Sequence, residues 1–229
     1  MWNEFLSLIY PKTCPGCNEV MIKNEIGICV LCSLDLPKTN YCKDRANPVA
    51  KLFWGRLDLE IAISSYYFNK ENIIQHLIHA LKYKGDKMVG EILGVELGKD
   101  IQKVNKYKNI DVIIPVPIHN KKLKNRGYNQ SLFIAKGVRK VINVPIIDEI
   151  LLRHYDGSTQ TTKSRFDRWK NVYNNFDIRN NNYLEYKHIL LVDDVVTTGA
   201  TIEACGRSLQ SIKGVKLSVA TLASADMLS

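Results

Sequence analysis

Apolar positions along the chain form two kinds of pattern that alternate with each other. Short, almost continuous apolar runs predict buried parallel strands, and stripes with helical spacing predict amphipathic helices between them. The runs predict strands over 61–68, 111–117, 189–192 and 216–222. The stripes predict helices from a cap at Asn69 or Asn72 to about Tyr83, over 87–104 and 131–141, and after residue 201. We therefore expect an α/β fold with a mainly parallel sheet and helices on both faces.

The stretch 188–201, HILLVDDVVTTGAT, organises the rest of the chain. Its apolar run ends at two adjacent carboxylates, and a turn rich in threonine then leads into a helix. A strand that delivers a turn onto a helix N-terminus presents unpaired N–H groups, which suit a phosphate. The residues predicted to hold that phosphate are Thr197, Thr198, Gly199, Ala200 and Thr201. The helix is expected to bury one stripe made of Ile202, Cys205, Leu209 and Ile212.

The two carboxylates, Asp193 and Asp194, would repel a phosphate beside them, so they should face another part of the ligand. Adjacent carboxylates bind vicinal hydroxyls or a hydrated Mg²⁺ well. A ligand with a phosphate at one end and a diol in the middle is a ribose 5-phosphate. We expect both acids to face solvent and assign them the catalytic role. A solvated acid pair in an unrelated strand–turn–helix is the alternative, and it leaves the threonines without a role.

A basic segment follows the predicted strand over 111–117. It begins at His119, ends at Arg126 and contains three lysines. A basic loop after a central strand lies where an open α/β sheet binds anions, and pyrophosphate fits it. An ordinary solvated loop is the alternative.

Four cysteines stand in two C-x-x-C pairs near the start of the chain. They are Cys14, Cys17, Cys29 and Cys32. Two such pairs at this spacing are typical of one tetrahedral Zn²⁺ with four protein ligands, which is a structural site. Disulfides and redox cysteines are the alternatives. Cys42 is interpreted as a bystander and Cys205 as a core residue.

Three segments resemble known families. LLVDD-x-x-x-TGxT over 190–201 resembles the motif with which type I phosphoribosyltransferases bind phosphoribosyl pyrophosphate (PRPP). The segment 114–136, IPVPIHNKKLKNRGYNQSLFIAK, is similar to the V-P-V-P-x-H…R-G-[FY]-N-Q segment of the ComF family, with Ile114 replacing the first valine. The family's R…T-x-x-Q…R-x-x-N signature is matched by Arg153, Gln160, Arg168 and Asn171. Gly157 stands at the family's threonine position, which puts a role for that hydroxyl in doubt.

The resemblance implies a type I phosphoribosyltransferase with a Rossmann-like fold and a small N-terminal zinc ribbon. It implies a zinc module over 1–45 and a phosphoribosyltransferase domain over 46–229. In the second domain the PRPP loop would span 189–201, and a mobile loop over 155–170 would close over the ligand. Residues that could contact pyrophosphate are His119, Arg126, Lys163 and Arg168. The cofactors implied are structural Zn²⁺ and Mg²⁺ bound with PRPP.

The acceptor is not identified by the sequence. Purine-salvage relatives have an aspartate where Thr197 stands, so hypoxanthine–guanine salvage is disfavoured. No nucleophilic cysteine follows Met1, which argues against a full amidophosphoribosyltransferase. We expect transfer of ribose 5-phosphate to an unknown acceptor. The alternatives are a PRPP sensor and, as the resemblance implies, a non-enzymatic factor that handles single-stranded DNA in natural transformation.

Composition adds information on partners and compartment. The net charge of +9 is compatible with polyphosphate ligands or nucleic acid, and equally with a merely basic surface. The aromatic island over 51–56, KLFWGR, is expected to pack onto the main domain, and base stacking is its alternative. No apolar run has the length of a membrane span, and the start lacks a signal-peptide pattern. We therefore expect a cytoplasmic protein without membrane insertion. The resemblance implies a DNA-uptake helicase as a candidate partner beside single-stranded DNA, and a homo-oligomer is a further candidate.

Overall fold

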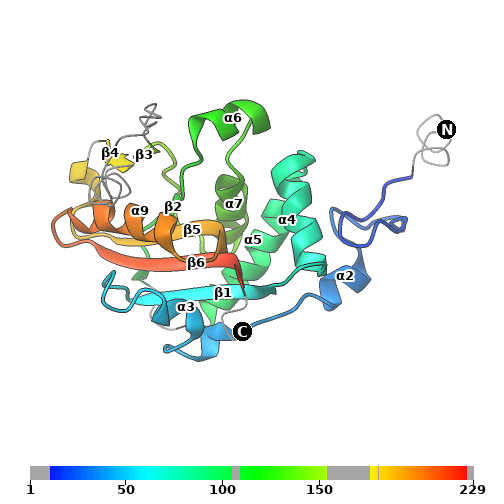
Figure 1. Ribbon diagram of the computed structural model, residues 1–229, viewed down its shortest axis with the longest axis horizontal. Helices are drawn as coiled ribbons and strands as arrows, with labels where there is room; N and C mark the ends of the chain where they lie inside the picture. Colours follow the sequence, from blue (N-terminus) through cyan, green and yellow to red (C-terminus); the bar gives the residue numbers. More distant parts are fainter. Residues whose placement is uncertain (1–10, 105–108, 154–175, 180, 226–229) are drawn as a thin grey trace, which may run out of the picture.

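A four-stranded parallel sheet forms the centre of the computed structural model, which describes residues 11–104, 109–153, 176–179 and 181–225 (Figure 1). The strand order is β1–β6–β5–β2. These strands are β1 (Ile61–Phe68), β2 (Val112–Pro115), β5 (His188–Val196) and β6 (Lys216–Ala225). All four strands expected from the sequence are confirmed: β1 has the expected bounds, and the other three differ at one or both ends. A separate antiparallel pair joins β3 (Leu151–Arg153) to β4 (Phe176–Ile178).

Helices cover both faces of the sheet. One face carries α4 (Ile73–Tyr83), α5 (Lys87–Gln102) and α7 (Gln130–Ile142), and the other carries α3 (Pro48–Lys51) and α9 (Ala200–Gln210). Successive side chains of a strand point to opposite faces. In β5, Leu190 and Val192 therefore join the core with α4, α5 and α7, whereas Ile189 and Leu191 join the core with α9. Burial on both faces explains why this strand is almost continuously apolar.

The cysteine module packs against α4 and α5. It contains the short helix α2 (Val30–Leu34) and lies beside α4 at one end of the molecule (Figure 1). Nδ1 of His76 lies 2.9 Å from the Gly16 carbonyl oxygen, which ties α4 to the first C-x-x-C turn. The chain then runs beside β1, where Lys38 bridges to Tyr66, and passes through η1 (Tyr41–Lys43).

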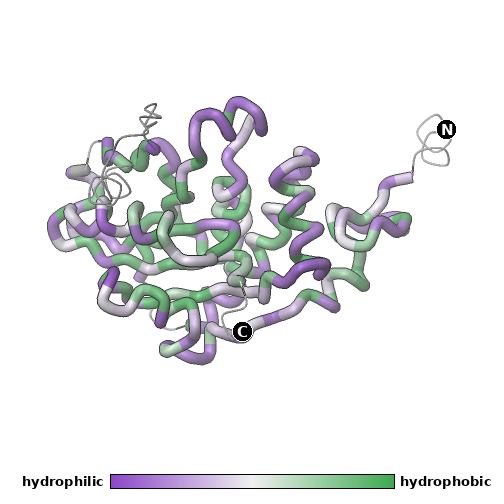
Figure 2. The backbone as a smooth tube through the Cα atoms, viewed as in Figure 1, coloured by the Kyte–Doolittle hydropathy of each residue, from purple (hydrophilic) through white to green (hydrophobic). Residues whose placement is uncertain are grey.

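The basic segment after β2 is a helix, and its expectation as a loop is wrong. This helix, α6 (Asn120–Arg126), is capped by His119, whose Nδ1 accepts a hydrogen bond from the Lys121 N–H at 3.1 Å. It ends at Gly127, whose φ of +79° favours glycine. Figure 2 shows α6 as a hydrophilic stretch. Its sequence lacks an apolar stripe, so the hydrophobic pattern did not indicate a helix.

Other differences concern ends and connections. Ile212 is buried as expected but lies beyond the end of α9. The 51–56 segment splits, because Phe53 is buried whereas Trp54 is 64% exposed. A short 3₁₀ helix, η3 (Asn181–Leu184), precedes β5. The expected mobile loop over 155–170, with Lys163 and Arg168, lies outside the described residues. In the part of the chain that the structure describes, no helix has the length and apolarity to span a membrane.

Candidate active site and metal centre

Asp193 and Asp194 lie at the carboxyl end of β5, next to the start of α9. The expectation that both face solvent is wrong, since the residues are only 8% and 5% exposed. Asp193 Oδ1 accepts hydrogen bonds from the Ser131 hydroxyl and from the Asp194 N–H, both at 2.9 Å. Burial, and after it the neighbouring charge of Asp194, raises the pKa of Asp193 to about 7. A proton or cation is therefore favoured at this pair.

Asp194 has one satisfied and one unsatisfied carboxylate oxygen. Its Oδ1 accepts a hydrogen bond from the Val195 N–H at 2.6 Å. Its Oδ2 lies 3.0 Å from Nζ of Lys82, a contact with the geometry of an ion pair and not of a hydrogen bond. Within the described residues no hydrogen bond reaches this buried oxygen. The ion pair offsets part of the cost of burying this oxygen, and a ligand hydroxyl that donates to it would complete its hydrogen bonding.

The turn between β5 and α9 places its polar groups around a small cavity of about 60 Å³. The cavity is lined by Asp193 and the run 195–202, which includes every residue predicted to hold phosphate: Thr197, Thr198, Gly199, Ala200 and Thr201. Gly199 is the N-cap of α9 with φ +75°, and a Cβ there would lie 2.8 Å from the Phe53 ring. Glycine is thus required both by backbone conformation and by space. Thr197 and Thr198 are exposed to a ligand.

Arg56 and Glu203 support this turn from outside it. Arg56 Nη1 donates a hydrogen bond to the Thr198 carbonyl oxygen at 2.9 Å, and its Nε donates to Glu203 Oε2 at 2.7 Å. Arg207 donates to the other Glu203 oxygen at 2.9 Å. The 51–56 segment therefore packs onto the main domain as expected, with its buried ring under Gly199 and its arginine on the turn.

The basic residues of α6 divide into two roles. His119 caps the helix, so this side chain interacts with the backbone. Arg126 donates to Gln130 Oε1, and its guanidinium carbon lies 5.4 Å from the centroid of the Tyr83 ring. Arg126 thus faces the end of α4 near Lys82. No signal in the sequence indicated that Lys82, Ser131 or Arg56 would lie at the site.

The four predicted cysteines gather into one cluster. The Sγ atoms of Cys14, Cys17, Cys29 and Cys32 all lie within 4.8 Å of one another, and those of Cys17 and Cys29 are 3.8 Å apart. A tetrahedron of Zn–S bonds of about 2.3 Å has S···S edges close to that distance. The Gly16 and Cys29 N–H groups point at Cys14 Sγ, as expected around a thiolate, and hydrogen bonds of this kind hold the pKa of Cys14 at about 7 against the raising effect of burial. The donor set therefore fits zinc, and Cys205 is buried in the core as expected.

Comparison with known proteins gives the same assignment. Residues 129–227 match the family model of the phosphoribosyl transferase domain. Competence protein F of Haemophilus influenzae is 27% identical over 169 residues, which cover 73% of each chain. Competence protein ComFC of Bacillus subtilis is 25% identical over 214 residues, which cover 92% of this chain and 82% of the relative. The DNA utilization protein YhgH of Shigella flexneri is 26% identical over 216 residues, with 85% and 89% covered.

The parallel sheet, the acid pair and the glycine turn agree with the match of residues 129–227 to the phosphoribosyl transferase domain. The chain is similar to competence proteins F and ComFC over most of its length, and a four-cysteine cluster fit for zinc precedes the matched domain.

Proposed function

We propose that this protein binds PRPP together with Mg²⁺ and transfers ribose 5-phosphate to an acceptor nucleophile, with release of pyrophosphate. The observation that carries the proposal is the buried acid pair: Asp193 lines a cavity of about 60 Å³ at the start of α9, and Asp194 Oδ2 has an ion-pair partner but no hydrogen bond among the described residues. The 5-phosphate would bind the N–H groups and hydroxyls of residues 197–201. The ribose hydroxyls would donate hydrogen bonds to Asp193 and Asp194.

The proposed transfer needs no covalent bond between the ligand and the protein. The bond between the anomeric carbon and the pyrophosphate oxygen breaks, and a bond from that carbon to the acceptor forms. Mg²⁺, held by Asp193 or Asp194 together with ligand oxygens, would neutralise charge on the pyrophosphate. The side chains of this chain position the ribose and hold the 5-phosphate, so catalysis is chiefly orientation and electrostatic stabilisation. Arg126, together with Lys163 and Arg168 of the expected mobile loop over 155–170, would contact the pyrophosphate.

The test is calorimetric titration of PRPP with and without Mg²⁺, followed by a pyrophosphate-release assay on the same sample with a panel of acceptors. Binding with release identifies an enzyme and its acceptor class. Tight binding without release on every acceptor favours a PRPP sensor. Absence of binding to the wild-type protein contradicts the proposal.

A second candidate function is the handling of single-stranded DNA without catalysis. It is supported by the net charge of +9, by the lysines of α6 and by the names of the competence relatives. Binding through phosphates falls steeply as salt rises. A fluorescent oligonucleotide titrated at two salt concentrations tests it, and this binding should survive Asp193→Asn. A DNA-uptake helicase remains a further candidate partner, and the cytoplasm the expected compartment.

The cysteine module is proposed to be structural. Its four ligands leave no open position on a tetrahedral Zn²⁺, so the metal would hold the 1–45 module against α4 and would not take part in the transfer. The 46–229 region would then carry the chemistry.

A further inference from the structure

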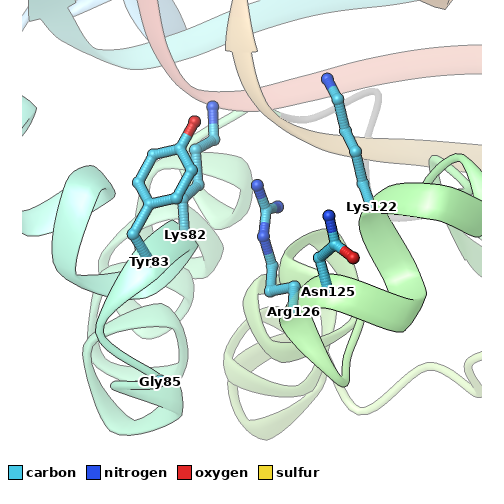
Figure 3. A pocket seen from close by; sticks show the side chains of 6 residues that line it. All are labelled: Lys82, Tyr83, Gly85, Lys122, Asn125 and Arg126. Carbon is cyan, nitrogen blue, oxygen red and sulfur yellow. The ribbon is translucent and has the colours of Figure 1, made fainter.

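A pocket of about 220 Å³ lies between the end of α4 and α6 (Figure 3). A single water needs only about 10–15 Å³ on the same measure, so the pocket can hold a polyatomic group. It is lined by Lys82, Tyr83, Gly85, Lys122, Asn125 and Arg126. Figure 3 shows the lysines and the arginine pointing to the same side from the two helices.

The pocket wall is strongly cationic. Three of its six lining residues carry a positive charge, and none of these described lining residues is acidic. Arg126 is already fixed, because it donates to Gln130 and lies over the Tyr83 ring. Among these three cations Lys82 has a carboxylate partner, Asp194, so the like charges of the pocket wall repel one another more strongly once a ligand takes that partner. An anion with at least two negative charges would relieve that repulsion.

Lys82 connects this pocket to the acid pair. Its side chain is 23% exposed, and its Nζ lies 3.0 Å from the unsatisfied Oδ2 of Asp194. Asp193, the preceding residue, lines the cavity of the phosphate turn. These contacts place the acid pair between the phosphate cavity and the cationic pocket. PRPP carries its phosphate, its diol and its diphosphate in the same order.

A ligand that binds Asp194 Oδ2 also breaks the ion pair between Asp194 and Lys82. When a ribose hydroxyl or a cation occupies Asp194 Oδ2, the ammonium group loses its partner. Lysine is a compact charge on a flexible four-carbon stem, so it can turn from the carboxylate to an anion in the adjoining pocket. Arg126 would add a second positive charge from the position in which Tyr83 and Gln130 hold its guanidinium.

We infer that Lys82 has two successive partners: it neutralises Asp194 in the empty site and holds the diphosphate of PRPP in the pocket between α4 and α6 once the ligand is bound. This inference rests on the proposed function. It assigns a ligand contact to a residue of α4, a helix that belongs to none of the motifs read from the sequence.

Three ligands separate this role from the rest of the site: PRPP with Mg²⁺, inorganic pyrophosphate, and ribose 5-phosphate, which lacks the diphosphate. Each is titrated by calorimetry into the wild-type protein and into the Lys82→Met, Lys82→Arg and Lys84→Met variants. Lys84 is the matched control, because it is an exposed lysine two residues further along. Thermal melting of each variant checks that it is folded.

We expect Lys82→Met to weaken the binding of PRPP and of pyrophosphate at least tenfold. The affinity for ribose 5-phosphate should change less than threefold. Lys82→Arg should restore part of the lost affinity, and Lys84→Met should match the wild type. Wild-type affinity of Lys82→Met for PRPP overturns the inference alone. An equal loss for all three ligands also overturns it, because Lys82 would then act only on Asp194. Failure of the wild-type protein to bind PRPP overturns the proposed function as well.

Discussion

Arg56 holds the carbonyl oxygen of Thr198 through a hydrogen bond of 2.9 Å from Nη1. The same guanidinium donates through Nε and Nη2 to Glu203, which is only 6% exposed and lies in the first turn of α9. One arginine thus fixes the phosphate turn to the helix that follows it. An arginine in this forked geometry cannot be replaced by the single charge of a lysine.

Substitution of Arg56 by glutamine is expected to weaken the binding of PRPP about fivefold to tenfold. It should also lower the free energy of unfolding by about 1–3 kcal/mol. The turn would lose its external donor, and the buried Glu203 would lose one of its two cationic partners. Calorimetry and thermal melting measure the two effects. Lys51→Gln is the control, because Lys51 is exposed in the same segment. A variant that melts lower but binds PRPP with unchanged affinity would show that the hydrogen bond of Arg56 to the turn does not contribute to ligand binding.

The double variant Asp193→Asn with Asp194→Asn is expected to bind PRPP at least about 100-fold more weakly. Each hydrogen bond to a charged group contributes about 1.5–3 kcal/mol, and two carboxylates are removed. The fold should tolerate the change, because the amide oxygen of an asparagine at position 193 could still accept from Ser131 and two buried like charges disappear. Calorimetry measures the loss, with the exposed Asp35→Asn as a control. Unchanged affinity would contradict the ribose assignment.

Local sequence signals are enough to predict the strands, the phosphate turn and the cysteine cluster, because the residues that form each one lie close together in the chain. The near-continuous apolar run of β5 and the Thr–Gly turn after it are local signals. Ser131 and Lys82 could not be predicted, because they come from α7 and α4 and meet the acid pair only through the sheet order. Because Ser131 and Lys82 contact the carboxylates, these are buried, and the expectation that they face solvent is wrong.

His188 is expected to make the stability of the fold depend on pH. It lies in β5, 6% exposed, with Nε2 at 2.8 Å from the Ser218 hydroxyl oxygen. Burial lowers the pKa of His188 below its usual value near 6.5. The unfolded chain then binds a proton more readily than the folded one, so stability is lost as pH falls through the unfolded pKa.

Urea unfolding at pH 7.5 and pH 5.5 tests this for the wild type and for His188→Gln. The wild type should lose more stability between the two pH values than the variant, in which no proton can be taken up at this position. Protonation of the cysteines affects both proteins equally and cancels in the comparison. Equal losses would show that His188 is not the group responsible.

Cys14→Ser is expected to remove the bound zinc and to unfold mainly the cysteine module. Cys14 is fully buried, and its sulfur accepts hydrogen bonds from the N–H groups of Gly16 and Cys29, so its loss removes a ligand and two contacts that order the module. Elemental analysis should find one equivalent of zinc in the wild type and in Cys42→Ser, the control, because Cys42 lies outside the four-sulfur group. Circular dichroism should retain most of the helix signal, since α4, α5 and α7 also pack on the strands and on one another, and the core with α9 contains none of the four cysteines. A Cys14→Ser protein that kept a full equivalent of zinc would contradict the four-cysteine assignment.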